Sequence, residues 1–112
     1  MHTISSNGDS KWWTQDRIAQ LKRRISNPTI LTLLNLTAER AGEWVEFKEL
    51  CQETGRPSAG VKSDLSAFIR LIKREFEDNE NAWLPYEIRG NLPTIPTSYR
   101  MPAEIARRWI EA

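Results

Sequence analysis

Residues 58–76 contain a regular succession of apolar side chains, which strongly limits the structures open to this segment. These residues follow one another at spacings of four, three, four and four: Val61, Leu65, Phe68, Ile72 and Phe76. At about 100° per residue, all of them fall within about 60° of Val61. The pattern predicts a long amphipathic helix with one buried face, and that face needs other elements to cover it.

Capping residues and apolar spacing predict further helices around this one. The predicted helices span residues 15–25, 28–40, 46–54, 58–76 and 102–112. Thr14, Asn27 and Ser58 are candidate N-terminal caps, because their side-chain oxygens accept from the free backbone N–H groups of a first turn. Gly55 is suited to the left-handed conformation that often follows a helix. Lys22, Arg23 and Arg24 are interpreted as cations that compensate the negative end of the first helix dipole.

Three short strands are predicted between these helices, at residues 43–45, 83–89 and 98–101. Pro85 restricts the second of them to an edge position or a bulge. The element order predicts a mainly helical α+β fold with a small β-hairpin. It is the order of a winged helix-turn-helix with extra N- and C-terminal helices. Residues 46–76 would form the helix-turn-helix and residues 83–101 the wing.

The chain length indicates one domain. A chain of 112 residues is below the usual size of a two-domain protein. Residues 1–11 are expected to form a disordered leader and residues 12–112 the winged-helix domain. The polar N-terminus lacks the basic and apolar regions of a signal peptide, and no apolar run is long enough for a membrane span. We therefore expect a cytoplasmic protein that does not contact membranes.

The supply of nucleophiles and metal ligands argues against an enzyme. The chain has a single cysteine, Cys51, and a single histidine, His2, which lies in the leader. A Cys/His zinc site is therefore not available within one chain, and a Cys–His or Ser–His pair would depend on a residue in the leader. We expect no catalytic residues, no metal and no cofactor, with Cys51 as a small buried side chain.

The charges are segregated along the chain, although the net charge is only +1. Residues 56–74 carry a net +4, whereas residues 43–55 carry −3 and residues 75–87 carry −5. Arginine outnumbers lysine eleven to five, and its planar guanidinium suits phosphates and base edges. The basic block coincides with the long predicted helix.

The face of helix 58–76 opposite its apolar side carries cations and hydroxyls, with Asp64 placed at the core edge. Such a one-sign face suits the major groove of DNA, although a solvated face is the alternative. Gly60 near the start of the helix indicates either close approach to a phosphate or tight packing on the preceding helix. The residues predicted to contact DNA here are Arg56, Ser58, Lys62, Ser63, Ser66, Arg70, Lys73 and Arg74. In the wing, Arg89 and Arg100 are predicted to contact the DNA backbone or the minor groove, with solvated hairpin ends as the alternative.

Five tryptophans are a large number for this length. Trp44 and Trp83 lie on strand segments and are predicted to belong to the core. Trp12, Trp13 and Trp109 lie on the terminal elements, whose apolar surface needs a cover. These elements pair either inside one chain or across a two-fold dimer, and paired DNA half-sites favour the dimer. The predicted dimer interface consists of Trp12, Trp13, Trp109 and Ile110.

Three stretches of the chain resemble a family of short bacterial proteins that is described as a domain of unknown function. The stretches are NPTILTLLNLTAERAGEWVEFKELCQETG, LSAFIRLIKREF and YRMPAEIARRW. The resemblance covers about residues 12–112. It implies a winged-helix-like fold and a bacterial cytoplasmic protein, and it supplies no functional residues.

Taken together, these features predict a winged-helix protein that binds double-stranded DNA and regulates transcription, with helix 58–76 in the major groove. The alternative is a winged-helix module for protein–protein interaction that binds no nucleic acid. In that case the acidic segments and the exposed tryptophans would bind an unidentified protein partner. The low net charge favours the alternative, and the one-sign helix face favours DNA.

Overall fold

The computed structural model describes residues 10–76, 84–90 and 98–112. In this part of the chain it contains five helices and three short strands. The helices are α1 (Gln15–Arg24), α2 (Pro28–Glu39), α3 (Phe47–Thr54), α4 (Ser58–Glu75) and α5 (Ala103–Glu111). The strands are β1 (Val45–Glu46), β2 (Glu87–Arg89) and β3 (Ser98–Arg100).

Local capping explains where α1 and α2 begin and where α3 ends. The Thr14 hydroxyl accepts from the backbone N–H of Arg17 at the start of α1, and the Asn27 side chain accepts from Thr29 at the start of α2. Gly55 ends α3 in the left-handed conformation, with φ of 71°, where a β-carbon would be strained. The caps predicted at Thr14, Asn27 and Gly55 are confirmed. The cap predicted at Ser58 is wrong, because α4 begins at Ser58 and Pro57 is its N-cap, without a side-chain hydrogen bond.

The three strands form one small antiparallel sheet in the order β1-β3-β2. Tyr99 lies at its centre, paired with Val45 on one side and Ile88 on the other. These three side chains share one face of the sheet, since they lie opposite one another across the strands. Val45 and Tyr99 are buried, so this face contributes to the core.

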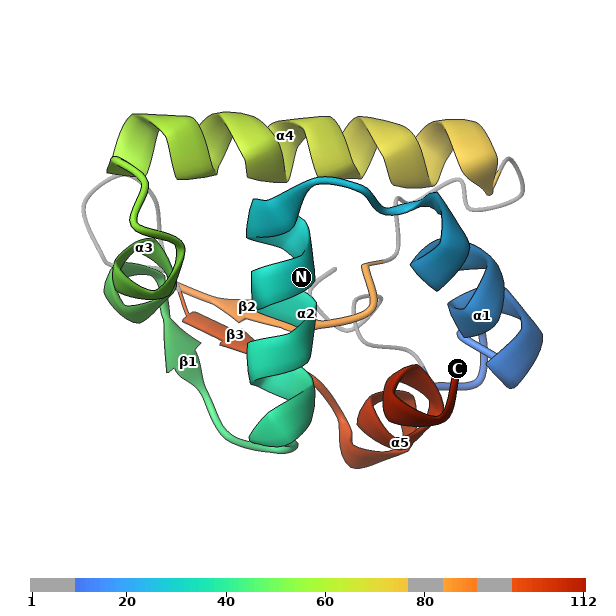
Figure 1. The fold of residues 1–112 in the computed structure, drawn as a ribbon. Helices are drawn as coiled ribbons and strands as arrows, with labels where there is room; N and C mark the ends of the chain where they lie inside the picture. The colour runs from blue at the N-terminus through green and yellow to red at the C-terminus, as the bar shows by residue number, and fades with distance from the viewer. Residues whose placement is uncertain (1–9, 77–83, 91–97) are drawn as a thin grey trace.

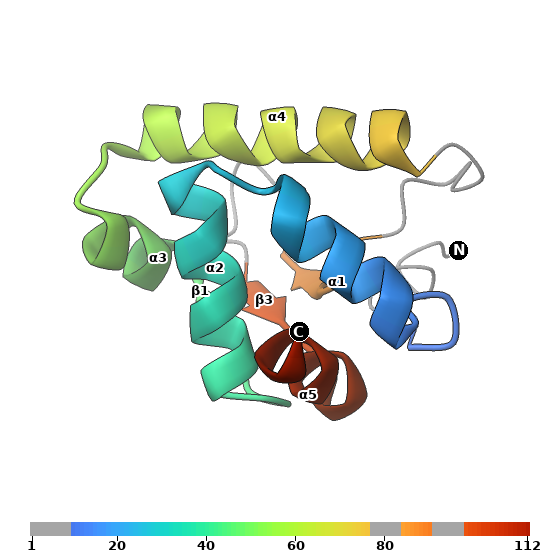
Figure 2. The same ribbon diagram turned by 45° about the vertical axis from the view of Figure 1, so that its right-hand side comes forward.

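Helix α4 lies across one end of the molecule, with α2 running away from it (Figure 1). Helices α1 and α5 lie side by side next to α2 in both views (Figures 1 and 2). In Figure 1, α3 and the sheet lie below the N-terminal half of α4, and α1 lies below its C-terminal end. The hydrophobic core lies between these elements and receives side chains from every helix. Val61, Phe68, Ile72 and Phe76 of the predicted apolar series are buried, whereas Leu65 is half-buried.

The structure confirms a mainly helical fold with a small antiparallel sheet. Residues 1–9 of the predicted leader and residues 91–97 of the predicted wing lie outside the described residues, as does Trp83, a predicted core residue at the start of the wing. Ser10 belongs to the described structure, where its carbonyl accepts from the Arg108 guanidinium at 2.6 Å. None of the described helices has the length and apolar character that crossing a membrane requires.

Candidate nucleic-acid interface

The face of α4 that points away from the core carries the predicted DNA-contacting side chains. Lys62, Ser63, Ser66, Arg70 and Lys73 are all exposed. Because α4 is continuous from Ser58 to Glu75, these positions lie on one side of a single helix, as their spacing predicted. Ser58 and Arg74, at the two ends of α4, are also exposed. We call Lys62, Ser63, Ser66, Arg70 and Lys73 the cationic face.

The two carboxylates of α4 are directed away from the cationic face. Asp64 is turned toward α2, where its Oδ2 accepts from the Thr29 hydroxyl at 2.6 Å. Glu75 is half-buried and lies 3.2 Å from Arg24 of α1 and 3.5 Å from Arg74. Arg24 therefore adds a positive charge at the C-terminal end of α4. From the sequence, residues 22–24 are interpreted only as cations at the negative end of the first helix dipole, and a position of Arg24 beside α4 is not predicted.

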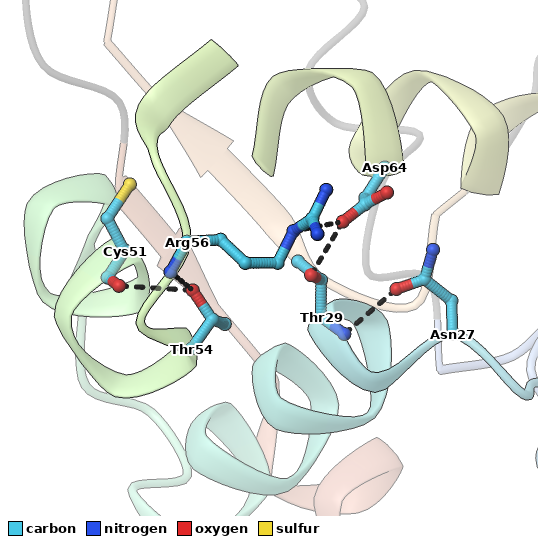
Figure 3. A network of polar contacts seen from close by, with 6 residues as sticks. All are labelled: Asn27, Thr29, Cys51, Thr54, Arg56 and Asp64. Carbon is cyan, nitrogen blue, oxygen red and sulfur yellow. Dashed lines mark hydrogen bonds and ion pairs between the residues drawn. The ribbon is translucent and has the colours of Figure 1, made fainter. Parts of the chain in front are cut away.

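A polar network anchors the start of α4 to the start of α2 (Figure 3). Asp64 lies at its centre and binds both the Thr29 hydroxyl and, at 3.1 Å, the Arg56 guanidinium. Asn27 extends the network by capping the backbone N–H of Thr29 at 2.8 Å. These contacts fix the position of the α4 N-terminus relative to α2.

Arg56 belongs to this network, although it was predicted to contact DNA. The Arg56 guanidinium packs closely against Gly60. A β-carbon at position 60 would lie only 2.8 Å from the Arg56 Nη2 atom. The absence of a side chain at Gly60 thus leaves room for Arg56 to reach Asp64. The close contact at Gly60 is therefore with a residue of the turn, and not with the preceding helix as one of the two sequence-based interpretations predicts. The Arg56 side chain is still 48% exposed.

The turn between α3 and α4 is held by the Thr54 side chain. The Thr54 hydroxyl donates to the Cys51 carbonyl at 3.0 Å and accepts from the Arg56 backbone N–H at 3.2 Å (Figure 3). Cys51 is half-buried, and burial raises the pKa of its thiol above the ordinary value. The thiol form therefore predominates at neutral pH, in line with a packing role for this cysteine.

The network makes the stability of the protein dependent on the charge of Asp64. The hydrogen bond from Thr29 lowers the pKa of the Asp64 carboxyl below its ordinary value, and Arg56 contributes to the same effect. A lowered folded-state pKa stabilises the protein above about pH 3.9, the unfolded value, and this stabilisation is lost as the pH falls through the folded-state pKa. We expect Asp64→Asn to lower the free energy of unfolding by about 1 kcal/mol at pH 7. The difference from the parent protein should shrink below pH 4.

Urea unfolding of both proteins between pH 7 and pH 2.5 measures this difference. Glu53→Gln is the matched control, because Glu53 is an exposed carboxylate on α3 and surface substitutions stay within about 0.5 kcal/mol. A difference between Asp64→Asn and the parent that stays constant over this pH range would show that the Asp64 charge does not support the fold.

The two wing arginines lie against the ring of Trp44, the residue before β1. The Arg89 and Arg100 guanidinium carbons lie 4.3 Å and 4.5 Å from the centre of the Trp44 ring. Arg100 also donates to Glu87 at 2.6 Å. Trp44 is half-buried, so the prediction that places it wholly in the core is wrong. Arg89 is exposed and remains accessible for a phosphate, whereas Arg100 is half-buried and neutralised by Glu87.

Two of the tryptophans predicted at a dimer interface are buried within one chain, so that prediction is wrong for them. Trp13 is 0% exposed and Trp109 is 2% exposed. The Trp109 indole N–H donates to the Asn35 side chain at 2.8 Å, and Trp13 packs edge-on against Phe76. The terminal helices therefore cover each other inside one chain. Of the four predicted residues, Trp12 is half-buried and Ile110 is exposed, and a dimer through them stays a prediction.

Sequence reasoning missed the residues whose roles depend on tertiary contacts. Thr29 and Asp64 are 35 residues apart in the chain, and neither belongs to a recognisable motif. A glycine in the first turn of the helix, four residues after the basic turn residue, was the one available signal for the Arg56 contact. Within the described residues, no three His, Cys, Asp or Glu side chains gather in a way that could hold a metal ion.

Comparisons of the chain with family models, curated proteins and solved structures gave no match. The resemblance to a bacterial family therefore stays a prediction.

Proposed function

We propose that this protein binds double-stranded DNA through the cationic face of α4 and that it acts as a transcriptional regulator. The observation that carries the proposal is the single sign of charge on that face. Lys62, Arg70 and Lys73 are exposed, while both carboxylates of α4 have partners elsewhere. A helix face selected for solubility alone usually mixes both signs of charge.

The arrangement of elements supports a winged helix-turn-helix as the fold behind this function. Helices α3 and α4 are joined by the short turn 55–57 and follow α2 and β1. Strands β2 and β3 then pair with β1 in the order β1-β3-β2. In this fold the second helix of the helix-turn-helix enters the major groove, and that helix is α4.

Each group has a defined role in the proposed complex. The cations of α4 bind phosphates or guanine edges, and Ser63 and Ser66 donate to or accept from phosphates and bases. Arg89 contacts the backbone from the hairpin, where Trp44 limits the conformations of its guanidinium. Arg56 is a positioning residue, since its ion pair with Asp64 holds the start of α4 in place.

Binding of a fluorescently labelled random-sequence duplex tests the proposal. We expect a Kd on the order of 1–100 μM at physiological salt and tighter binding at low salt, because phosphate contacts supply most of the non-specific affinity. Fluorescence anisotropy with increasing protein concentration gives this value. An absence of binding at about 50 mM salt would contradict the proposal. It would favour the protein–protein interaction module, in which the acidic segments bind a basic partner.

A further inference from the structure

A pocket of about 320 Å³ lies between α4 and the sheet. Leu65 and Ile69 line it from α4, Ile88 and Tyr99 line it from the sheet, and Phe47 lines it from α3. Leu65, Ile69, Ile88 and Phe47 are all half-buried, although the pattern around Leu65 predicts a core position. The pocket explains their exposure, because it leaves these apolar side chains without full cover.

The chemistry of the lining defines the kind of molecule that fits. Apart from Lys62 and Ser66, every residue that lines the pocket is aliphatic or aromatic. The Lys62 Nζ lies 5.9 Å from the centre of the Phe47 ring, so its charge stands beside the apolar lining. Burial raises the pKa of Tyr99 to about 12 and raises that of Tyr86 as well, so both phenols are neutral at pH 7. Lys62 is therefore the charged group of the lining.

We infer that this pocket binds a small organic carboxylate, with its apolar body among the side chains of α4 and the sheet and its carboxylate on Lys62. The volume falls in the range of about 300–1,000 Å³ that is typical of ligand pockets. An apolar body replaces water on Leu65, Ile69 and Phe47. A carboxylate on Lys62 forms a charge-assisted hydrogen bond.

The position of the pocket links such a ligand to DNA binding. Lys62 and Ser66 line the pocket and also belong to the cationic face. A carboxylate bound to Lys62 neutralises one of the cations that would face the DNA, so the ligand is expected to lower the affinity for DNA. This link rests on the proposed function, whereas ligand binding itself does not.

Isothermal titration calorimetry without DNA tests the site with two probes, 1-naphthoate and octanoate. We expect at least one of them to bind and Lys62→Gln to weaken it about tenfold, the size of one charge-assisted contact. Lys73→Gln is the matched control, because Lys73 is an exposed lysine of α4 that does not line the pocket. The Lys73→Gln variant should bind the probe with the same affinity as the parent protein. Tighter binding of octanoate indicates an acyl-chain ligand, and tighter binding of 1-naphthoate indicates an aromatic one.

A second variant tests whether the probe binds in this pocket or on another apolar surface of the protein. Ile69→Phe fills part of the pocket and should lower the affinity for the probe at least tenfold. The thermal midpoint of this variant checks that it is folded. If that variant loses its fold, Ser66→Leu narrows the exposed edge of the pocket instead. The site is refuted if neither probe binds at millimolar concentration, or if Lys62→Gln and Lys73→Gln bind the probe equally. DNA binding that persists in either case would leave the proposed function standing.

Discussion

Replacing Trp109 by alanine is expected to lower the free energy of unfolding by about 3–5 kcal/mol, the usual cost of removing a buried tryptophan. Trp109 is almost fully buried and donates to Asn35 of α2. Its carbonyl accepts from Lys22 of α1 at 2.9 Å, so α5 is tied to both neighbouring helices. A loss of this size is a large part of the 5–15 kcal/mol that stabilises a typical domain.

The neighbouring residue provides a matched control for this substitution. Ile110 is 63% exposed, and Ile110→Ala should change the free energy of unfolding by less than about 0.5 kcal/mol. Urea denaturation at a fixed protein concentration measures both variants, and sedimentation reports their oligomeric state. If Trp109→Ala kept its stability and only dissociated a dimer, α5 would pack against a second chain and the burial described above would be contradicted.

Removing two cations from α4 is expected to produce the largest effect on DNA binding. Lys62→Ala combined with Arg70→Ala should weaken duplex binding about 30-fold, if each contact contributes about 1 kcal/mol. Both side chains are exposed, so the thermal midpoint should stay almost unchanged. Fluorescence anisotropy at constant salt gives the change in affinity.

A variant that removes the same total charge elsewhere shows whether the position of the cations matters. Arg23→Ala combined with Arg107→Ala serves this purpose, because both residues are exposed and lie on α1 and α5. We expect it to bind DNA within about threefold of the parent protein, since distant exposed charges are largely screened. Equal losses in the two double variants would show that only net charge governs binding.

The features that the sequence predicted correctly are those that depend on neighbouring residues. Thr14, Asn27 and Gly55 act on the helix ends next to them, and the apolar spacing from Val61 to Phe76 requires no knowledge of other elements. The cationic face followed from the same periodicity. These features are local, and the structure bears out the helices that they predicted.

The features that the sequence did not reveal depend on which elements meet in space. The apolar pattern around Trp13 and Trp109 shows that these side chains need to be buried. It does not show whether they pack against helices of the same chain or against a second copy of the protein. The Arg56–Asp64 pair requires the geometry of the turn before α4 and the space at Gly60. Trp44 precedes a strand of two residues, which is too short for alternation to indicate which side chains face the core.

The salt dependence of DNA binding in the parent protein and in the Lys62→Ala, Arg70→Ala double variant tests the central claim most sharply. Each phosphate contact adds about 0.9 to the slope of log association constant against log salt concentration. If Lys62 and Arg70 both contact phosphates, the slope of the double variant should be shallower by about 1.8. Equal slopes together with equal affinities for the two proteins would contradict the claim that the cationic face of α4 binds DNA.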